Sequence, residues 1–234
     1  MTYDKYEAAL EFNRIYDILK AHSNIDGLLR GELCVDEWEH DKANDVPENI
    51  WVDHGATRIV IGDSNSCKYV FKINYDINDP IDYNKNEMFI YNRAVEEGVE
   101  DWFAWIAKIG TIHIDDRELE VCAQAWCDVD FDKIAEQSFY CQFSAECAAE
   151  GYDINHLTEE ESEEIYDKID EDYVGSGAGM RDYVYSNYPY NKVRALFNFL
   201  DKYGVNDTHA GNWGYLNDEL VLTDYAGYRC NLVV

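Results

Sequence analysis

A polar loop followed by a short hairpin constrains this chain more than any other feature. The loop spans residues 205–212 and places Asp207 five positions before Asn212. Apolar residues on either side of an Asn-Asp turn predict a hairpin over 213–223, just before Asp224. Because the strands of a tight hairpin run antiparallel, the hairpin should return Asp224 to the side of Asn212. Three side chains with oxygen ligands should therefore gather in one small region.

The rest of the chain reads as an α+β protein with helices and short strands. Helices are predicted over 4–20, 84–97 and 191–203, with Gly204 ending the last and a further helix opening at Thr158. Strands are predicted over 58–61, 68–73, 108–114, 118–126, 213–216 and 220–223. Gly175–Gly179 reads as a flexible break, and the stretch between 20 and 50 resists assignment. The predicted domains are a helical extension over 1–50, a small antiparallel-sheet lobe over 51–128 and a mainly helical lobe over 129–234.

The composition indicates an ordered protein with an extreme charge. Apolar residues make up 47% of the chain and aromatic residues 15%, which is ample for a packed core. Forty-eight acidic residues against 19 basic ones give a net charge of −29. Such a surface repels nucleic acid and anionic membranes, so neither is expected as a direct partner, whereas it would attract a basic protein. Solubility alone is the alternative explanation of this charge.

Cysteine usage and the N-terminus both point to the cytoplasm. The seven cysteines include no Cys-x-x-Cys pair, so idle or buried thiols are expected rather than disulfides or structural zinc. The six histidines are scattered, without a pair at metal-ligand spacing. The first residues are polar and acidic, unlike a signal peptide, and no apolar run reaches the length that a membrane span needs.

A lysine and a glutamate form a second candidate group. Strand alternation puts Lys72 on the same face as Val70, where a lysine is often only a charge at a sheet edge. Glu87 falls on the apolar face of the helix predicted over 84–97, and a carboxylate there needs a cationic partner. The two residues are 15 positions apart, a spacing that a strand, a loop and one helical turn can bridge.

The two groups together suit phosphoryl transfer. That reaction needs a carboxylate near the attacking hydroxyl, oxygen ligands for Mg²⁺ and a cation for the phosphates. One Asp and one Asn can ligate Mg²⁺, which leaves Asp207 to orient or deprotonate the hydroxyl. For any one position, an Asn- and Asp-rich turn is the simpler explanation. The order of all five residues along the chain favours the catalytic interpretation.

These residues resemble the protein-kinase-like fold, more closely its aminoglycoside- and choline-phosphotransferase branch than eukaryotic protein kinases. The catalytic loop of that branch reads His-Gly-Asp-x-His-x-x-Asn, and residues 206–212 carry its Asp-x-His-x-Gly-Asn part. The run 225–227, Tyr-Ala-Gly, stands where the family's Asp-Phe-Gly motif continues. Small kinase-like proteins of phages and prophages are similar in length and in the Gly-Asn-x-Gly turn. The likeness covers about 51–126 and 191–227.

The resemblance implies a two-lobed fold with ATP and Mg²⁺ as cofactors. It implies that Asp207 is the catalytic base and that Asn212 and Asp224 are the metal ligands. It also implies that Lys72 binds the nucleotide phosphates, with Glu87 as its helix partner. A protein of this kind would act in the cytoplasm, that of the host if a phage encodes it.

Three departures from the family pattern bear on these roles. The Gly-rich loop is reduced to residues 53–57 with a single glycine, so the backbone N–H groups of Gly55, Ala56 and Thr57 are the remaining candidates for phosphate binding. Asparagine replaces the residue that normally precedes the catalytic Asp. The chain ends ten residues after Asp224, which predicts a truncated helical lobe without an activation segment or peptide-docking helices.

Two functions of different classes follow from these observations. The first is a Mg·ATP-dependent phosphotransferase whose acceptor the sequence does not identify. The second is a catalytically weak pseudokinase that binds a basic host or defence protein through its acidic surface. A third interpretation combines them, with the nucleotide serving only as a structural cofactor.

Overall fold

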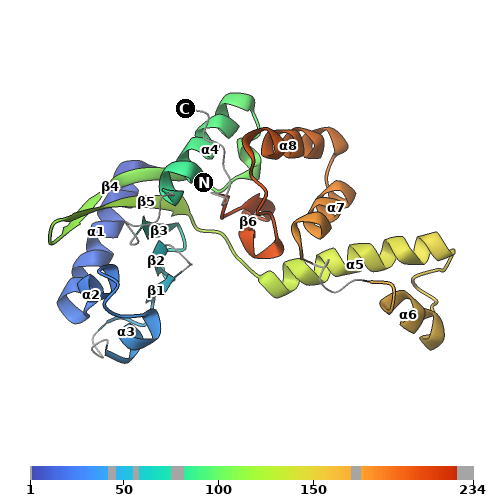
Figure 1. Cartoon of the computed structure of the whole chain (residues 1–234), viewed down its shortest axis with the longest axis horizontal. Helices are drawn as coiled ribbons and strands as arrows, with labels where there is room; N and C mark the ends of the chain where they lie inside the picture. The colour runs from blue at the N-terminus through green and yellow to red at the C-terminus, as the bar shows by residue number, and fades with distance from the viewer. Residues whose placement is uncertain (1, 42–45, 55–57, 75–81, 170–174, 226–234) are drawn as a thin grey trace. The chain divides into compact units, whose positions relative to one another are not determined.

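The computed structural model describes residues 2–41, 46–54, 58–74, 82–169 and 175–225. The chain divides into two units. Figure 1 colours the chain by residue number, from blue at the N-terminus to red at the C-terminus. The sheet unit comprises Met1–Glu96 and Ala104–Trp126, and the helical unit comprises Glu97–Phe103 and Cys127–Val234. Because each unit has its own packing, each is described by itself.

Helices and strands follow one another in the order expected of an α+β protein. The helices are α1 (Lys5–His22), α2 (Ile25–Leu29), α3 (Val35–Asp41), α4 (Tyr83–Glu97), η1 (Glu100–Trp102), α5 (Phe131–Glu150), α6 (Glu159–Tyr166), α7 (Gly177–Asn187), α8 (Tyr190–Tyr203) and η2 (Ala210–Asn212). The strands are β1 (Ile50–His54), β2 (Arg58–Asp63), β3 (Tyr69–Asn74), β4 (Ile106–Ile114), β5 (Arg117–Ala125), β6 (Trp213–Leu216) and β7 (Glu219–Leu222). The predicted α+β class is confirmed.

The sheet unit is built on one antiparallel sheet of five strands. The strand order is β1-β2-β3-β5-β4, so β3 is the central strand. Its register pairs Lys72 with Val60 of β2 and with Cys122 of β5. Gly62 of β2 allows β1 to approach, because a Cβ atom there would lie 2.4 Å from the ring of Trp51. Lys72 therefore projects from the middle of the sheet, between two paired neighbours.

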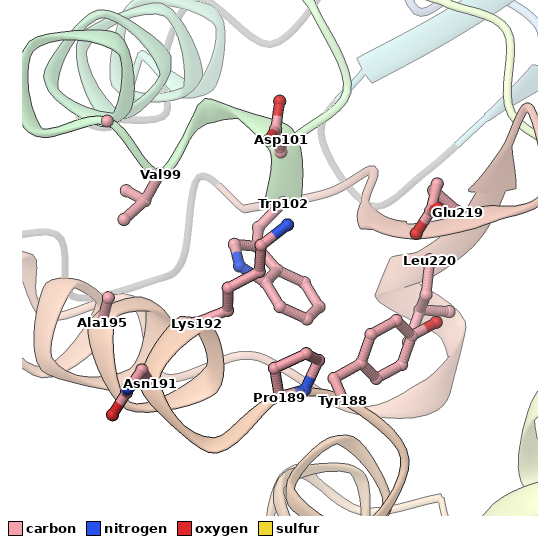
Figure 2. Close-up of a pocket in the computed structure, with 11 residues that line it drawn as sticks. Val99, Asp101, Trp102, Tyr188, Pro189, Asn191, Lys192, Ala195, Glu219 and Leu220 are labelled. Carbon is pink, nitrogen blue, oxygen red and sulfur yellow. The ribbon is translucent and has the colours of Figure 1, made fainter.

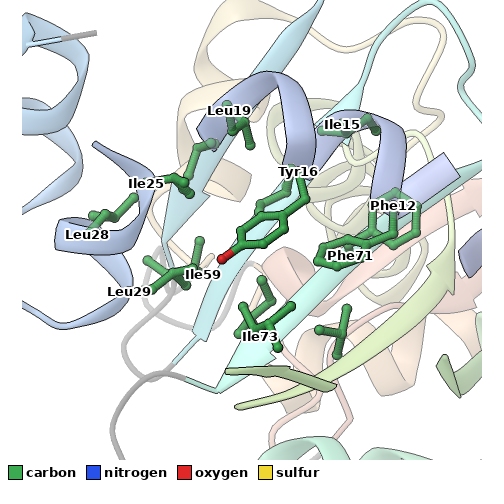
Figure 3. Close-up of a cluster of buried hydrophobic side chains, with 14 of the residues drawn as sticks. Phe12, Ile15, Tyr16, Leu19, Ile25, Leu28, Leu29, Ile59, Phe71 and Ile73 are labelled. Atoms are coloured by element: carbon green, nitrogen blue, oxygen red, sulfur yellow. The ribbon is translucent and has the colours of Figure 1, made fainter. Parts of the chain in front are cut away.

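Helix α1 covers one face of this sheet. Its N-terminus is capped by Asp4, whose side chain accepts a hydrogen bond from the amide of Glu7 at 2.9 Å. Figure 3 shows the ring of Phe12 against Phe71 of β3, and the two ring centroids are 5.3 Å apart. The segment 1–50, predicted as a helical extension, thus contributes to the same hydrophobic core as the sheet.

The stretch that the sequence left unassigned contains α2 and α3. The side chain of Asn24 caps α2 by accepting a hydrogen bond from the amide of Gly27 at 3.1 Å. Leu28, Leu29 and Trp38 are all buried in the core of the sheet unit. These two helices have 5 and 7 residues, too few for an apolar repeat to be recognised.

The caps and turns of the helical unit follow the sequence prediction closely. Thr158 forms a capping box with Glu161 at the start of α6. Gly204 ends α8 in the left-handed conformation, with φ of 70°. The hairpin β6–β7 turns through Asn217 and Asp218, which have φ of 52° and 67°. Each of these local predictions is confirmed.

The prediction of a flexible break at Gly175–Gly179 is wrong, because α7 begins inside it. The hydroxyl of Ser176 accepts a hydrogen bond from the amide of Gly179 at 3.2 Å and caps the helix. A Cβ atom at Gly177 would lie 3.0 Å from the hydroxyl oxygen of Thr208. The glycine at that position therefore serves close packing between the first turn of α7 and the loop before β6.

Candidate functional site

Lys72 and Glu87 form a buried ion pair in the sheet unit. The ammonium nitrogen of Lys72 lies 3.1 and 3.2 Å from the two carboxylate oxygens of Glu87. Lys72 is 6% exposed and Glu87 is fully buried. Because β3 is the central strand, the alternative interpretation of Lys72 as a charge at a sheet edge is excluded. The expected pairing of a strand lysine with a helix glutamate is confirmed.

Arg58 joins this pair and was missed by the sequence analysis. Its two terminal guanidinium nitrogens lie 2.7 and 3.2 Å from the two oxygens of Glu87, a bidentate arrangement. The guanidinium carbon also lies 5.8 Å from the ring centre of Tyr83 in the first turn of α4. The alternation of side chains along β2 could have indicated that Arg58 lies on the face of the sheet that carries Lys72. Arg58 and Val60 share a face of β2, and Val60 pairs with Lys72.

The first turn of α4 is tied to the strands that carry the cluster. The side-chain amide of buried Asn84 donates to the carbonyl oxygen of Lys72 at 3.2 Å and to that of Glu120 at 3.4 Å. Cys122 pairs with Lys72 in the sheet, and burial, together with the charges of Glu120 and Glu87, raises the pKa of its thiol. This thiol therefore stays protonated and is a poor nucleophile.

In the helical unit, Asn212 and Asp224 lie side by side, as the hairpin predicts. The backbone carbonyl of Asn212 accepts hydrogen bonds from the amide of Thr223 at 2.8 Å and from that of Asp224 at 3.4 Å. The hydroxyl of Thr223 donates to the same carbonyl at 3.2 Å. These bonds attach the end of β7 to η2, so the positions of both predicted metal ligands are set by the main chain.

Asn212 also closes the loop back onto Asp207. The side-chain NH₂ of Asn212 donates to the backbone carbonyl of Asp207 at 2.8 Å. The indole N–H of buried Trp213 donates to the next carbonyl, that of Thr208, at 2.9 Å. With its amide nitrogen engaged in this way, Asn212 has its side-chain oxygen left as an acceptor.

The side chain of Asp207 remains partly open to solvent. It is 35% exposed, and one carboxylate oxygen lies 3.4 Å from Nε2 of His209. The other ring nitrogen of His209 accepts a hydrogen bond from the amide of Gly211 at 3.1 Å. His209 is thus engaged within the loop through both ring nitrogens and braces it.

Two predicted elements fall partly or wholly outside the described residues. Gly55, Ala56 and Thr57, the candidate phosphate-binding amides, lie outside them. So do the second and third residues of the Tyr-Ala-Gly run. Its first residue, Tyr225, is fully buried, with its ring centroid 5.1 Å from that of Phe103. The residue after Asp224 thus anchors this end of the loop in the core of the helical unit.

The donor atoms in the loop suit magnesium. In the described ranges, no group of three or more His, Cys, Asp and Glu side chains could hold a metal ion. An amide oxygen and a carboxylate fit Mg²⁺, which is usually held by one or two protein oxygens together with waters and substrate phosphates.

A separate cleft of about 610 Å³ lies in the helical unit between η1, the start of α8 and β7. Figure 2 shows the side chains of Trp102, Tyr188, Pro189, Lys192 and Leu220 around this cleft. The rings of Trp102 and Tyr188 meet edge to face, 5.1 Å apart. Burial raises the pKa of Tyr188, although the amide of Leu220 opposes this. None of the predicted site residues lines this cleft.

The comparisons with known proteins add no family to this description. No protein-family model, curated protein or solved structure was found to match the chain. Among the described residues, no helix has the length and apolar character needed to cross a bilayer.

Proposed function

We propose that this protein is a kinase-like phosphotransferase that uses Mg·ATP. The observation that carries the proposal is the buried pair of Lys72 and Glu87, on the central strand and on the helix that follows it. A buried ion pair is seldom needed for stability alone, because apolar residues of similar volume often serve as well. A lysine oriented by a helix glutamate is, however, what phosphate binding requires in kinases.

The roles of the other residues follow from their chemistry. The ammonium of Lys72 would bind phosphate oxygens, with Glu87 fixing its orientation. The amide oxygen of Asn212 and the carboxylate of Asp224 would ligate Mg²⁺, which neutralises charge on the phosphates when bound. Asp207 would accept the proton of the attacking hydroxyl.

In the proposed reaction, a bond forms between the acceptor oxygen and the γ-phosphorus of ATP. The bond between that phosphorus and the oxygen bridging to the β-phosphate breaks, and ADP leaves. The hydroxyl proton passes to Asp207, whose carboxylate is open enough to receive it. The bracing of the loop by His209 and Trp213 would keep this carboxylate in position.

Thermal unfolding with ATP, with and without Mg²⁺, tests the nucleotide site directly. Ligand at about 100 times its dissociation constant should stabilise the wild type by roughly 2.7 kcal/mol, a shift of several degrees. Asp224→Ala should lose the magnesium-dependent part of the shift and abolish phosphoryl transfer. Asp201→Ala, which removes an exposed carboxylate from α8, is the matched control and should behave as wild type. Activity retained in Asp224→Ala would refute the metal assignment.

The acidic surface supports a second candidate function, binding of a basic protein. The net charge is −29, and three consecutive glutamates, 159–161, occupy the first turn of α6. An association of this kind should weaken steeply as salt screens the charges. The assay is capture of a basic protein at low and high ionic strength, and binding that ignores salt would count against it. Nucleotide binding without turnover, together with such capture, would favour a purely structural role for ATP.

A further inference from the structure

Two cations, Arg58 and Lys72, contact the carboxylate of Glu87. Orienting a phosphate-binding lysine requires only that lysine and one carboxylate, so the second cation needs a role of its own. Arg58, Lys72 and Glu87 are 5%, 6% and 0% exposed. The shorter contact of Arg58 to the carboxylate is 2.7 Å, whereas both contacts from Lys72 exceed 3.0 Å. Arg58 is therefore the tighter of these two partners.

The two cations differ in how readily they can leave Glu87. A guanidinium matches a carboxylate with two parallel N–H groups, and that geometry is lost if the side chain turns. Arg58 is further fixed by the ring of Tyr83 on the same helix. An ammonium on a four-carbon stem can instead rotate and exchange partners. Lys72 is thus suited to move and Arg58 to stay.

We propose that Arg58 is a positioning residue, which holds the charge of Glu87 so that Lys72 can turn its ammonium toward the phosphates of Mg·ATP. Without Arg58, that movement would strip a buried carboxylate of a major compensating charge, which is strongly unfavourable. This inference rests on the proposed function, because it assigns Lys72 to phosphate. It adds a residue outside the pair that the family resemblance supplies.

A purely structural role for Arg58 is the competing explanation. Arg58 links β2 to α4 through Glu87, so its removal would destabilise the sheet unit in any case. A purely structural link would lower the free energy of unfolding but leave the dissociation constant of Mg·ATP unchanged in protein that is folded. A positioning role lowers the affinity of the folded protein as well, and does so only while Glu87 carries its charge, because Arg58 acts through the carboxylate.

A double-mutant cycle separates the two roles. The dissociation constant of Mg·ATP is measured by calorimetry for wild type, Arg58→Met, Glu87→Gln and the double variant, each verified as folded by circular dichroism. Arg58→Met should weaken binding about tenfold in the wild-type background and less than about threefold when Glu87→Gln is already present. Arg58→Lys keeps the charge but not the bidentate geometry, so it should recover part of the lost affinity, and it covers the case in which Arg58→Met does not fold.

The possible results distinguish this inference from the proposed function. Equal factors in both backgrounds, or no recovery in Arg58→Lys, would overturn the role of Arg58. If wild type binds Mg·ATP and Lys72→Met abolishes binding, the nucleotide site would survive that outcome. Absence of Mg·ATP binding in the wild type would overturn the proposed function, and the role of Arg58 with it.

Discussion

The charged cluster of the sheet unit and the polar loop of the helical unit are held in place by opposite means. In the cluster, Glu87 is fully buried and receives four hydrogen bonds from the side chains of Arg58 and Lys72. In the loop, Asn212 is fixed through its carbonyl by the amides of residues 223 and 224, while Asp207 stays 35% exposed. Charge holds the first group, and the main chain holds the second.

This difference separates a group held by buried charge from a group whose main chain is held by hydrogen bonds. A substitution in the cluster leaves a buried charge without its partner, so stability and function should fall together. The carboxylate of Asp207 is 35% exposed on a loop whose main chain is bonded elsewhere, so its removal should affect chemistry more than folding. Variants of the cluster should therefore lose more stability than variants of the loop.

Removal of the shared carboxylate should be the most damaging change in the cluster. Glu87→Ala removes the buried carboxylate that Arg58 and Lys72 share and should lower the free energy of unfolding by about 3–5 kcal/mol. Urea denaturation measures the loss. Glu96→Ala is the control on the same helix, because it removes an exposed carboxylate that is paired with Arg93. A similar loss in both variants would mean that the buried cluster contributes nothing special.

Stability should fall more when a hydrogen bond to the main chain of the loop is lost than when a loop carboxylate is removed. Trp213→Phe removes the donor to the carbonyl of Thr208 and should lower stability by about 1–3 kcal/mol. The nucleotide-induced thermal shift should also shrink, because the loop is less firmly held. Tyr215→Phe in the same strand removes a hydroxyl that donates to Gln137 and should leave that shift intact. An unchanged shift in Trp213→Phe would show that this anchor is dispensable.

The N-terminal cap of α6 lies outside both regions and gives a reference value for these changes in stability. Thr158→Ala removes the capping box of α6 and should lower stability by about 1 kcal/mol, as measured by urea denaturation. Thr158→Ser keeps the hydroxyl and should retain most of the wild-type stability. Neither variant should alter Mg·ATP affinity, and a change in that affinity would argue that α6 is coupled to the nucleotide site.

Local signals explain why so much of the fold could be predicted. Thr158, Gly204 and the Asn-Asp turn of the last hairpin each specify a cap or turn through their own chemistry. Arg58 could not be recognised in the same way, because its partner is 29 positions away and depends on the register of β2 with β3. Gly177 was misread because its glycine serves packing against Thr208, a contact that no local pattern contains.

The loop offered a stronger signal than the cluster for a related reason. Asp207 and Asn212 are close in sequence, and a tight hairpin brings Asp224 back to them, so their proximity follows from chain geometry. Lys72 and Glu87 were paired through an argument about buried charge, which required one carboxylate to have a cation but did not say how many. The number of cations around Glu87 is a tertiary property.

The pH dependence of stability should test the role of charge in the sheet unit through Asp63, the last residue of β2. Burial alone would raise the pKa of this carboxyl, but hydrogen bonds from Asn49, the amide of Asn65 and Arg14 outweigh it and hold the pKa below its usual 3.8. The folded state then binds fewer protons than the unfolded chain. The stabilising contribution of ionised Asp63 is present above the pKa of the unfolded chain and is lost as pH falls through the lower pKa of the folded state.

Asp63→Asn should therefore be less stable than wild type near neutral pH, and the gap should narrow in acid. Urea denaturation at several values from about pH 6 to about pH 2.5 measures both curves. The main-chain hydrogen bond from Thr223 to Asn212 joins two groups that do not titrate, so the opening of this bond should not follow the profile of Asp63. Hydrogen exchange at the amide of Thr223, which donates to Asn212, reports on it separately. If the two urea curves ran parallel throughout, the stabilising charge at Asp63 would be refuted, and the sheet unit would depend less on its ion pairs than its structure indicates.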